Sequence, residues 1–313
     1  MDRGVPEAIT HLAFKYRNGH LRLSKDLRMA ATYFKRAAGL GNVDAILELG
    51  TMYEDGDGVR TDIRKAMQLY RTAAELGEAN AQRNVALLLD KEGEHNAVEA
   101  AHFYKLAAAQ GLTEAEYNLA TCYEEGTGVD VDLEEAKRWY ARAAEKGDTD
   151  SEFALGLCYD VGRGVDVDFE EARRWYARAA AKGDHDAQVN LGFLYEEGNG
   201  VEVDFDEAKR LYELAAAQGD AVAECSIGDL YADGLGVDVD LEEAKRWYER
   251  AASQGNEEAI ARIPKIERKL VRAAARKLLL ALGGDLDAAV EALRHAESES
   301  ESESDSDSDD DSS

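Results

Sequence analysis

The sequence repeats itself with a period of 36 residues. The segment GVDVDLEEAKRWY begins at Gly128 and recurs unchanged at Gly236, and near-copies begin at Gly164 and Gly200. A period of this size is typical of stacked repeat arrays, in which each repeat packs only against its neighbours. A length of 313 residues would otherwise suggest about two domains. The repeat instead predicts an array that grows by addition.

The first part of each copy has the spacing of one buried helical face. In the copy that opens at Ala115, the residues Leu119, Cys122 and Tyr123 follow at i+4, i+7 and i+8. The residue after the leucine is usually glycine, which costs about 1 kcal/mol relative to alanine inside a helix. We therefore expect a neighbouring helix to approach closely at these positions: Gly50, Ala120, Gly156, Gly192 and Gly228.

A glycine pair, a valine and a second helix follow in each copy. Gly126 is expected to end the first helix in the left-handed conformation, and the valine after the pair to pack onto the stack. Asp132 precedes Glu135 by three residues, which is the spacing of a capping box. The second helix is expected to bury one stripe (Ala136, Tyr140, Ala143, Ala144) and to expose a solvated basic face (Lys137, Arg138, Arg142).

These residues together match a family pattern. The motif A-x(3)-L-G-x(2)-Y-x(2)-G-x-G-V-x(2)-D-x(3)-A-x(3)-Y-x(2)-A-A-x(2)-G closely resembles the Sel-one-like repeat, which is related to the tetratricopeptide repeats. The resemblance covers roughly residues 8–258. It implies an all-α, right-handed α-solenoid (superhelix) of antiparallel helix pairs. Seven copies open at Ala8, Ala45, Ala81, Ala115, Ser151, Ala187 and Ala223.

The array is irregular at its third copy and at its end. The third copy is two residues short, because DKEGEHNA lacks the glycine pair and the capping aspartate, and we expect the array to bend or loosen there. An eighth copy opens at Ala259 and is expected to fail at Pro264, since proline inside a helix costs about 3 kcal/mol. Residues 259–296, with a basic amphipathic stretch at 265–282, are expected to cap the array. A helix that docks a partner or lies on a membrane is the alternative.

The last segment, 297–313, contains no apolar residue and is expected to be disordered. It is interpreted as a solubility tail, with contact to a basic partner or to residues 265–277 as alternatives. Its serines are followed by acidic residues and resemble sites of acidophilic kinases. The candidate phosphorylation sites are Ser298, Ser300, Ser302, Ser304, Ser306 and Ser308.

The charge and cysteine content limit the partners and the compartment. The net charge is −28, and removal of the nine acidic residues of the tail leaves −19, which disfavours nucleic acid and anionic lipid. No signal peptide and no apolar run of about 20 residues is evident, so we expect a cytoplasmic or nuclear protein. Cys122 and Cys158 occupy equivalent positions in successive repeats, too far apart for a disulfide. We expect three reduced structural thiols.

The motifs of catalysis and of metal binding are not found. The D-x-D pairs are explained by capping rather than by a calcium loop, and the six histidines have no ligand spacing. The chain has no Gly-x-Ser-x-Gly, P-loop or Rossmann turn. We expect no catalytic residue, no metal and no cofactor. The pairs Trp139-Tyr140, Trp175-Tyr176 and Trp247-Tyr248 are interpreted as packing residues.

The first helix offers the best candidate for a binding surface. In tetratricopeptide arrays its exposed side lines the concave groove, and the asparagine before the leucine resembles those that hold a peptide backbone there. An amide can both donate and accept hydrogen bonds. Positions two residues after the leucine vary in polarity, which fits a recognition face and equally a solvated one. The candidate groove residues are Asn84, Asn118, Asn190, Thr121, Leu157, Phe193 and Asp229.

The function predicted from the sequence is a non-catalytic scaffold or adaptor that binds protein segments in this groove. A hydrolase-like enzyme or an activity-carrying subunit is the alternative from the bacterial relatives linked to β-lactam chemistry, which are cysteine-rich and secreted. The resemblance also implies, as a further alternative, an adaptor in protein quality control of the type that acts in endoplasmic-reticulum-associated degradation. A purely structural spacer is a third alternative.

Overall fold

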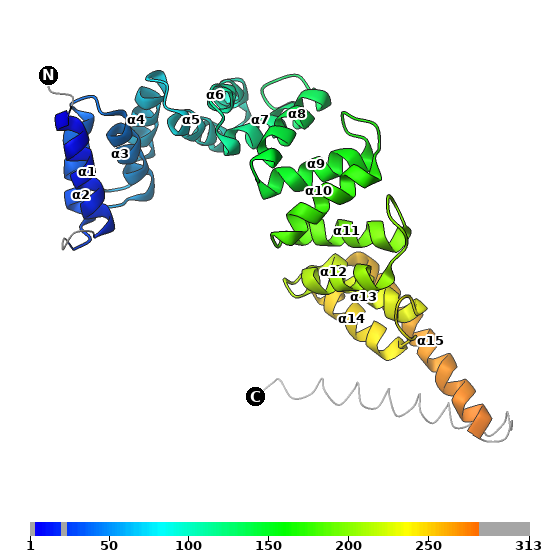
Figure 1. The fold of residues 1–313 in the computed structure, drawn as a ribbon. Coiled ribbons are helices and arrows are strands. Elements are labelled where there is room, and N and C mark those ends of the chain that lie inside the picture. Colours follow the sequence, from blue (N-terminus) through cyan, green and yellow to red (C-terminus); the bar gives the residue numbers. More distant parts are fainter. Residues whose placement is uncertain (1–3, 20–23, 282–313) are drawn as a thin grey trace, which may run out of the picture. The chain divides into compact units, whose positions relative to one another are not determined.

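The computed structural model describes residues 4–19 and 24–281 of the chain. These residues form fifteen α-helices and one 3₁₀ helix, and no strand (Figure 1). The chain divides into two compact units, Met1–Lys182 and Gly183–Ser313. Each unit consists of antiparallel helix pairs stacked on one another. The predicted all-α solenoid is confirmed, while its right-handed twist stays a prediction.

The first unit contains five helix pairs. Within each pair the two helices pack together, and the second helix also contacts the first helix of the next pair. The pairs are α1 (Gly4–Asn18) with α2 (Leu27–Ala38), α3 (Val43–Asp55) with α4 (Ile63–Glu75), α5 (Ala79–Glu92) with α6 (Ala97–Ala109), α7 (Thr113–Glu125) with α8 (Leu133–Glu145), and α9 (Thr149–Val161) with α10 (Phe169–Ala181).

The second unit contains two pairs and a longer helix. The pairs are α11 (His185–Glu197) with α12 (Phe205–Ala216) and α13 (Ala221–Asp233) with α14 (Leu241–Ser253), followed by α15 (Glu257–Ala281). We call α3, α5, α7, α9, α11 and α13 the first helices of their repeats, and the helix that follows each of them the second helix. Among the described helices, none is long and apolar enough to cross a membrane.

The predicted caps and glycine turns are present. Oδ1 of Asp132 accepts a hydrogen bond from the backbone N–H of Glu135 at 3.0 Å, which satisfies a donor that the helix leaves free. Gly126 ends α7 with φ of 76°. Gly128 is in close contact with the preceding repeat, because a Cβ there would lie 2.1 Å from the carbonyl oxygen of Ala97. The glycine pair therefore ends one helix and sets how closely the next repeat stacks.

The core follows the predicted stripes. Ala115, Leu119 and Cys122 are buried in α7, while Tyr123 is only half-buried. The second helix α8 buries the predicted residues Ala136, Tyr140, Ala143 and Ala144. The close approach predicted at the helix glycines is confirmed, because a Cβ on Gly50 would lie 2.6 Å from the ring of Tyr70.

The short third repeat has its own connection. A 3₁₀ helix, η1 (Glu94–Asn96), replaces the glycine loop, and α6 starts without a side-chain cap from Asn96. The loop is therefore irregular, as the missing glycine pair and capping aspartate indicated, while the expected bend of the array at this repeat stays a prediction. The pair α5 and α6 still packs as the others do, with Tyr104 of α6 buried.

The expected break at Pro264 is wrong. The helix α15 runs without interruption from Glu257 to Ala281 and contains Pro264. Pro264 and Ile260, the residue four positions earlier, are both exposed, so water can satisfy the carbonyl that proline leaves without a donor. The apolar residues Ala259 and Ile266 of α15 are buried against the last repeat. In the second unit, the near half of this helix therefore packs against the last repeat, and the capping role of residues 259–296 stays a prediction.

Candidate binding surface on the first helices

A pocket lies between the first helices α3 and α5. It has a volume of about 490 Å³, and its lining includes Thr51, Arg83, Asn84 and Leu87. Asn84 is a predicted groove residue, and Thr51 and Leu87 occupy the position two residues after the leucine. The lining also includes the carboxylates of Glu48, Glu54 and Asp55. We call it the α3–α5 pocket.

A second pocket lies between α5 and α7, at the short loop of the third repeat. It has a volume of about 240 Å³ and contains two predicted groove residues, Asn118 and Thr121. We call it the α5–α7 pocket. Its remaining lining consists of Asp90, Gly93, Glu94, Ala97, Tyr104, Cys122, Glu125 and Thr127.

Asn84 and Asn118 line these pockets, and their amide groups have no partner among the described residues. Within residues 4–19 and 24–281, neither side chain makes a hydrogen bond. Thr121 is tied more closely to the fold, because its hydroxyl lies 3.3 Å from the hydroxyl of Tyr140. The first unit thus brings two predicted asparagines to two pockets and leaves both amides available to a ligand.

The other predicted residues are placed differently. Leu157 is half-buried on α9. In the second unit, the amide of Asn190 donates to the backbone oxygen of Asp186 at 2.9 Å. The ring of Phe193 packs edge-on to Tyr212, with the ring centroids 5.6 Å apart. Asp229 accepts a hydrogen bond from Tyr248 at 2.7 Å. In that unit the candidate side chains make internal contacts.

The structure contains a row of tyrosine–carboxylate hydrogen bonds that was not predicted from the sequence. In each repeat from the second to the seventh, the buried tyrosine of the second helix donates its hydroxyl to an acidic residue late in the first helix. Burial raises the pKa of each of these tyrosines, so they remain donors at neutral pH. The pairs are Tyr70–Glu54, Tyr104–Asp90, Tyr140–Glu124, Tyr176–Asp160, Tyr212–Glu196 and Tyr248–Asp229. The indication in the sequence was an acidic residue nine positions after the opening residue in each repeat from the second to the sixth.

Three glutamates are buried between the two helices of their repeats. The side chain of Glu152 is fully buried, yet it forms ion pairs with Arg178 and Lys182 at 2.7 Å each. Arg178 also stacks over the ring of Trp175, 4.5 Å from its centroid. The same arrangement joins Glu116 to Arg142 and Lys146, and Glu224 to Arg250. Arg142 is exposed, as expected of a solvated face, and its guanidinium in addition pairs with the buried Glu116.

The cysteines are free and buried, as predicted. Burial raises the pKa of Cys122 to about 12 and the pKa of Cys158 and Cys225 to about 11. All three are protonated thiols at neutral pH, which makes them poor nucleophiles.

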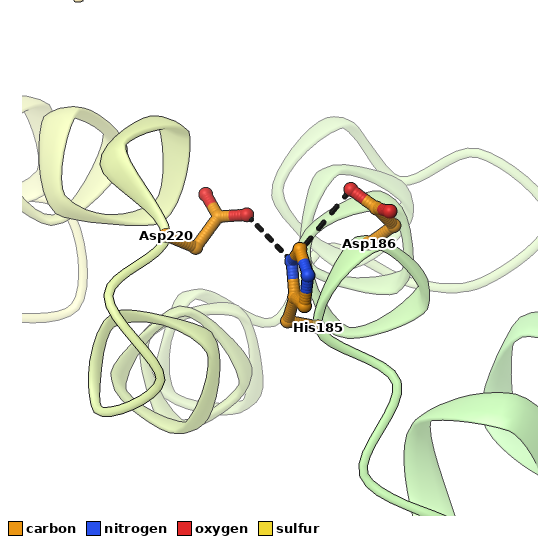
Figure 2. Close-up of side chains that lie close together, drawn as sticks. All are labelled: His185, Asp186 and Asp220. Carbon is orange, nitrogen blue, oxygen red and sulfur yellow. Dashed lines mark hydrogen bonds and ion pairs between the residues drawn. The ribbon is translucent and has the colours of Figure 1, made fainter. Parts of the chain in front are cut away.

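A histidine cluster joins the last two repeats. His185 lies between two aspartates, with its Nδ1 2.9 Å from Oδ2 of Asp220 and 3.7 Å from Oδ1 of Asp186 (Figure 2). Asp220 is also the N-cap of α13 and accepts hydrogen bonds from two backbone N–H groups. The ligand atoms lie within 4.8 Å of one another, the one such group among the described residues. Because Asp220 already binds both α13 and His185, we interpret the cluster as a link between repeats. The indication in the sequence was that His185 and Asp220 are 35 residues apart, which is nearly the length of one repeat.

Several predictions fall outside the described residues. They are the part of the capping segment 259–296 that follows Ala281, the acidic tail at 297–313 and the six candidate phosphorylation sites from Ser298 to Ser308. The basic stretch from 265 lies in α15, and its residues up to Ala281 are described.

The comparisons with known proteins agree with the geometry. A protein from uropathogenic Escherichia coli, described as a protective antigen displaying an SLR fold, has a TM-score of 0.78 at 32% identity, over 83% of this chain and 56% of that one. A Sel1 repeat protein from Oxalobacter formigenes has a TM-score of 0.66 at 34% identity, over 84% of this chain and 76% of that one.

Two curated relatives share part of the array. An F-box protein of Arabidopsis thaliana is 32% identical over 112 residues, which is 36% of this chain and 31% of the relative. DAP3-binding cell death enhancer 1 of Rattus norvegicus is 34% identical over 163 residues, which is 40% of this chain and 32% of the relative. The chain thus spans about a third of the length of these relatives.

The family model described as Sel1 repeat matches seven times without interruption, at residues 6–42, 43–78, 79–112, 113–148, 149–184, 185–220 and 221–256. The seven copies, their helix pairs and their solved structural neighbours all agree, and the chain belongs to the Sel1 repeat family.

Proposed function

We propose that this chain is a non-catalytic scaffold that binds extended segments of partner proteins along the exposed side of its first helices. The observation that carries the proposal is the pair of pockets on α3, α5 and α7, in which the amides of Asn84 and Asn118 have no partner among the described residues. An amide that can donate and accept at once suits the alternating N–H and C=O groups of an extended backbone.

The chemistry around these amides supports binding rather than catalysis. The thiol of Cys122 in the α5–α7 pocket is held protonated by burial. The tyrosines beside the carboxylates are kept protonated as well. Among the relatives, DAP3-binding cell death enhancer 1 is named for binding another protein. A shared array that covers a third of that protein supports an interaction role here.

The test is a quantitative comparison of partners. The chain carrying Asn84→Ala and Asn118→Ala is used as bait in proximity labelling and pull-down, beside the wild type. Asn199→Ala is the matched control, because Asn199 lies in a loop and bonds to Glu197. We expect the double variant to lose partners that the control keeps, with unchanged far-UV circular dichroism. An identical set of partners for all three baits would overturn the proposal.

A further inference from the structure

The carboxylates of the tyrosine row differ in what else they contact. In the second repeat, Glu54 accepts from Tyr70 through Oε2 and has the ammonium of Lys91, from the next repeat, 3.4 Å from Oε1. In the fourth repeat, Glu124 accepts from Tyr140 through Oε2 and pairs with Arg163 at 2.8 Å through Oε1. One oxygen is held by the repeat itself, and the other by a cation from the next repeat.

The last repeat has a related arrangement, in which the carboxylate comes from a different position and both partners contact the same oxygen, Oδ1 of Asp229. Asp229 accepts from Tyr248 and forms an ion pair with Arg262 of α15 at 3.0 Å. In three places, therefore, a cation of the following element satisfies a carboxylate that a buried tyrosine already holds. The arrangement recurs in both units with Lys or Arg as the cation.

Asp90 lacks this cation. Its Oδ2 accepts from Tyr104 at 2.5 Å, and within the described part of the chain its side chain forms no ion pair. The reason that Asp90 has no cation is found by aligning the repeats. Thr127 occupies the position that Arg163 has one repeat later, 36 residues on. Lys91, the next residue along the chain, is directed to Glu54 instead.

The space beside Asp90 is open. Asp90 is exposed, and it lines the α5–α7 pocket together with Glu94 and Glu125. The pocket lining contains three carboxylates and no lysine or arginine. Asp160 and Glu196 also have no ion pair among the described residues, but both are half-buried, and burial raises the pKa of Glu196. Asp90 is thus the accessible carboxylate of the row.

We infer that the α5–α7 pocket binds a lysine or arginine side chain of the partner segment, which takes the place of the missing internal cation. The inference rests on the proposed function and adds the chemistry of one partner residue. The three carboxylates of this pocket do not meet the ligand spacing of a metal site, which among the described residues only the His185 cluster meets. Their spread suits an elongated side chain with a terminal charge. Asn118 in the same lining can bind the backbone that carries this side chain.

A comparison of the repeats suggests a substitution that should block the α5–α7 pocket. Thr127→Arg reproduces the residue of the next repeat and should form an ion pair with Asp90, as Arg163 does with Glu124. The variant is therefore expected to fold at least as stably as the wild type and to close the pocket to outside cations. Asp90→Asn combined with Glu125→Gln removes two of the three charges of the pocket and keeps an acceptor for Tyr104. Glu75→Gln combined with Glu145→Gln is the matched control, because both residues are exposed and lie outside the pocket.

The probe is a displayed library of random dodecapeptides, selected on the full-length chain. We expect the selected peptides to be enriched in Lys or Arg. Affinity of a selected peptide, measured by fluorescence anisotropy, should fall about tenfold or more for Thr127→Arg, for Asp90→Asn/Glu125→Gln, and for a peptide with norleucine in place of its lysine. The control should remain within about twofold, since exposed charges outside the pocket are screened.

The outcomes separate this inference from the proposed function. Selected peptides without Lys or Arg that still depend on Asn84 and Asn118 would overturn the inference and leave the proposed function standing. Basic peptides that bind both Thr127→Arg and Asp90→Asn/Glu125→Gln as tightly as they bind the wild type would overturn it too. A library that yields no binding peptide would contradict both. Circular dichroism of each variant shows that the fold is retained.

Discussion

Gly156 faces the aromatic ring of Tyr176 so closely that a Cβ on Gly156 would lie 2.6 Å from Cδ1 of Tyr176. Tyr176 is fully buried and its hydroxyl is bonded to Asp160, so the ring has little room to move. Gly156→Leu should therefore destabilise the first unit by about 1–3 kcal/mol or more, the usual cost of overpacking a core. Denaturant unfolding of the full chain, followed by circular dichroism, measures this loss.

The same chain indicates how much alanine should cost at this site. The third and fourth repeats have Ala86 and Ala120 at the equivalent position, both buried, so the helix pair can accommodate one methyl group. Gly156→Ala should consequently be much milder than Gly156→Leu, because its gain in helix propensity of about 1 kcal/mol offsets part of the contact. An equal loss from the two substitutions would contradict this account.

A second prediction concerns the glycine that sets the stacking distance. Gly164 has φ of +66°, and a Cβ there would lie 2.2 Å from the carbonyl oxygen of Leu133 in the preceding repeat. Gly77 has φ of +90° with no atom within 4 Å of such a Cβ. Alanine at either site costs about 1–2 kcal/mol for the left-handed backbone, but only Gly164→Ala adds a clash with rigid backbone. We expect the larger drop in melting temperature for Gly164→Ala, and similar drops would exclude a stacking role.

The sequence was sufficient for the features that depend on neighbours along the chain. The period of 36 residues located the helix pairs, and the spacing of Asp132 and Glu135 located the start of α8. The contact between Gly50 and Tyr70 was expected as a close approach, although its partner was not named. Such features are repeated in most copies, and the repetition itself shows which residues build the scaffold.

Features that pair two variable positions could not be found in this way. Glu152 and Lys182 are 30 residues apart, and neither type is present in every copy. A buried acid was therefore not expected, and Arg178 was not recognised as its partner. The indication in the sequence was that these positions change together from one repeat to another. The sixth repeat has Gln188 in place of the glutamate, and it also has Gln218 in place of the lysine and Leu214 in place of the arginine. The continuous helix α15 was not predicted, because the cost of a proline was assigned from its place in the sequence. The actual cost depends on whether water can reach the backbone carbonyl that the proline leaves without a donor.

This joint variation gives the third prediction. Glu152→Gln alone leaves Arg178 and Lys182 facing a neutral amide, and because both cations are partly exposed we expect a loss of about 1–3 kcal/mol. Adding Arg178→Leu and Lys182→Gln reproduces the set found in the sixth repeat and should recover most of that loss. The measurement is the midpoint of denaturant unfolding for the single and triple variants. A triple variant that is less stable than the single one would show that the two sets are not interchangeable.

The last prediction follows from His185. Its hydrogen bond to Asp220 raises the pKa of His185 above 6.5, because the carboxylate favours the charged ring. A pKa that is higher in the folded chain means that the folded chain binds the proton more tightly than the unfolded chain. The stabilisation is therefore fully present below the unfolded pKa and is lost as the pH rises through the folded pKa.

The variant His185→Gln removes this proton and keeps a polar side chain at the start of α11. We expect the wild type to melt above the variant at about pH 5.5 and the difference to shrink by about pH 8.5, where the ring is neutral in both states. His11→Gln is the control, since His11 is an exposed histidine of the first unit. Because Asp184 and Asp186 also favour the charged ring, Asp220→Asn should reduce the pH dependence without abolishing it. A difference between wild type and His185→Gln that does not change with pH would show that His185 acts through packing alone.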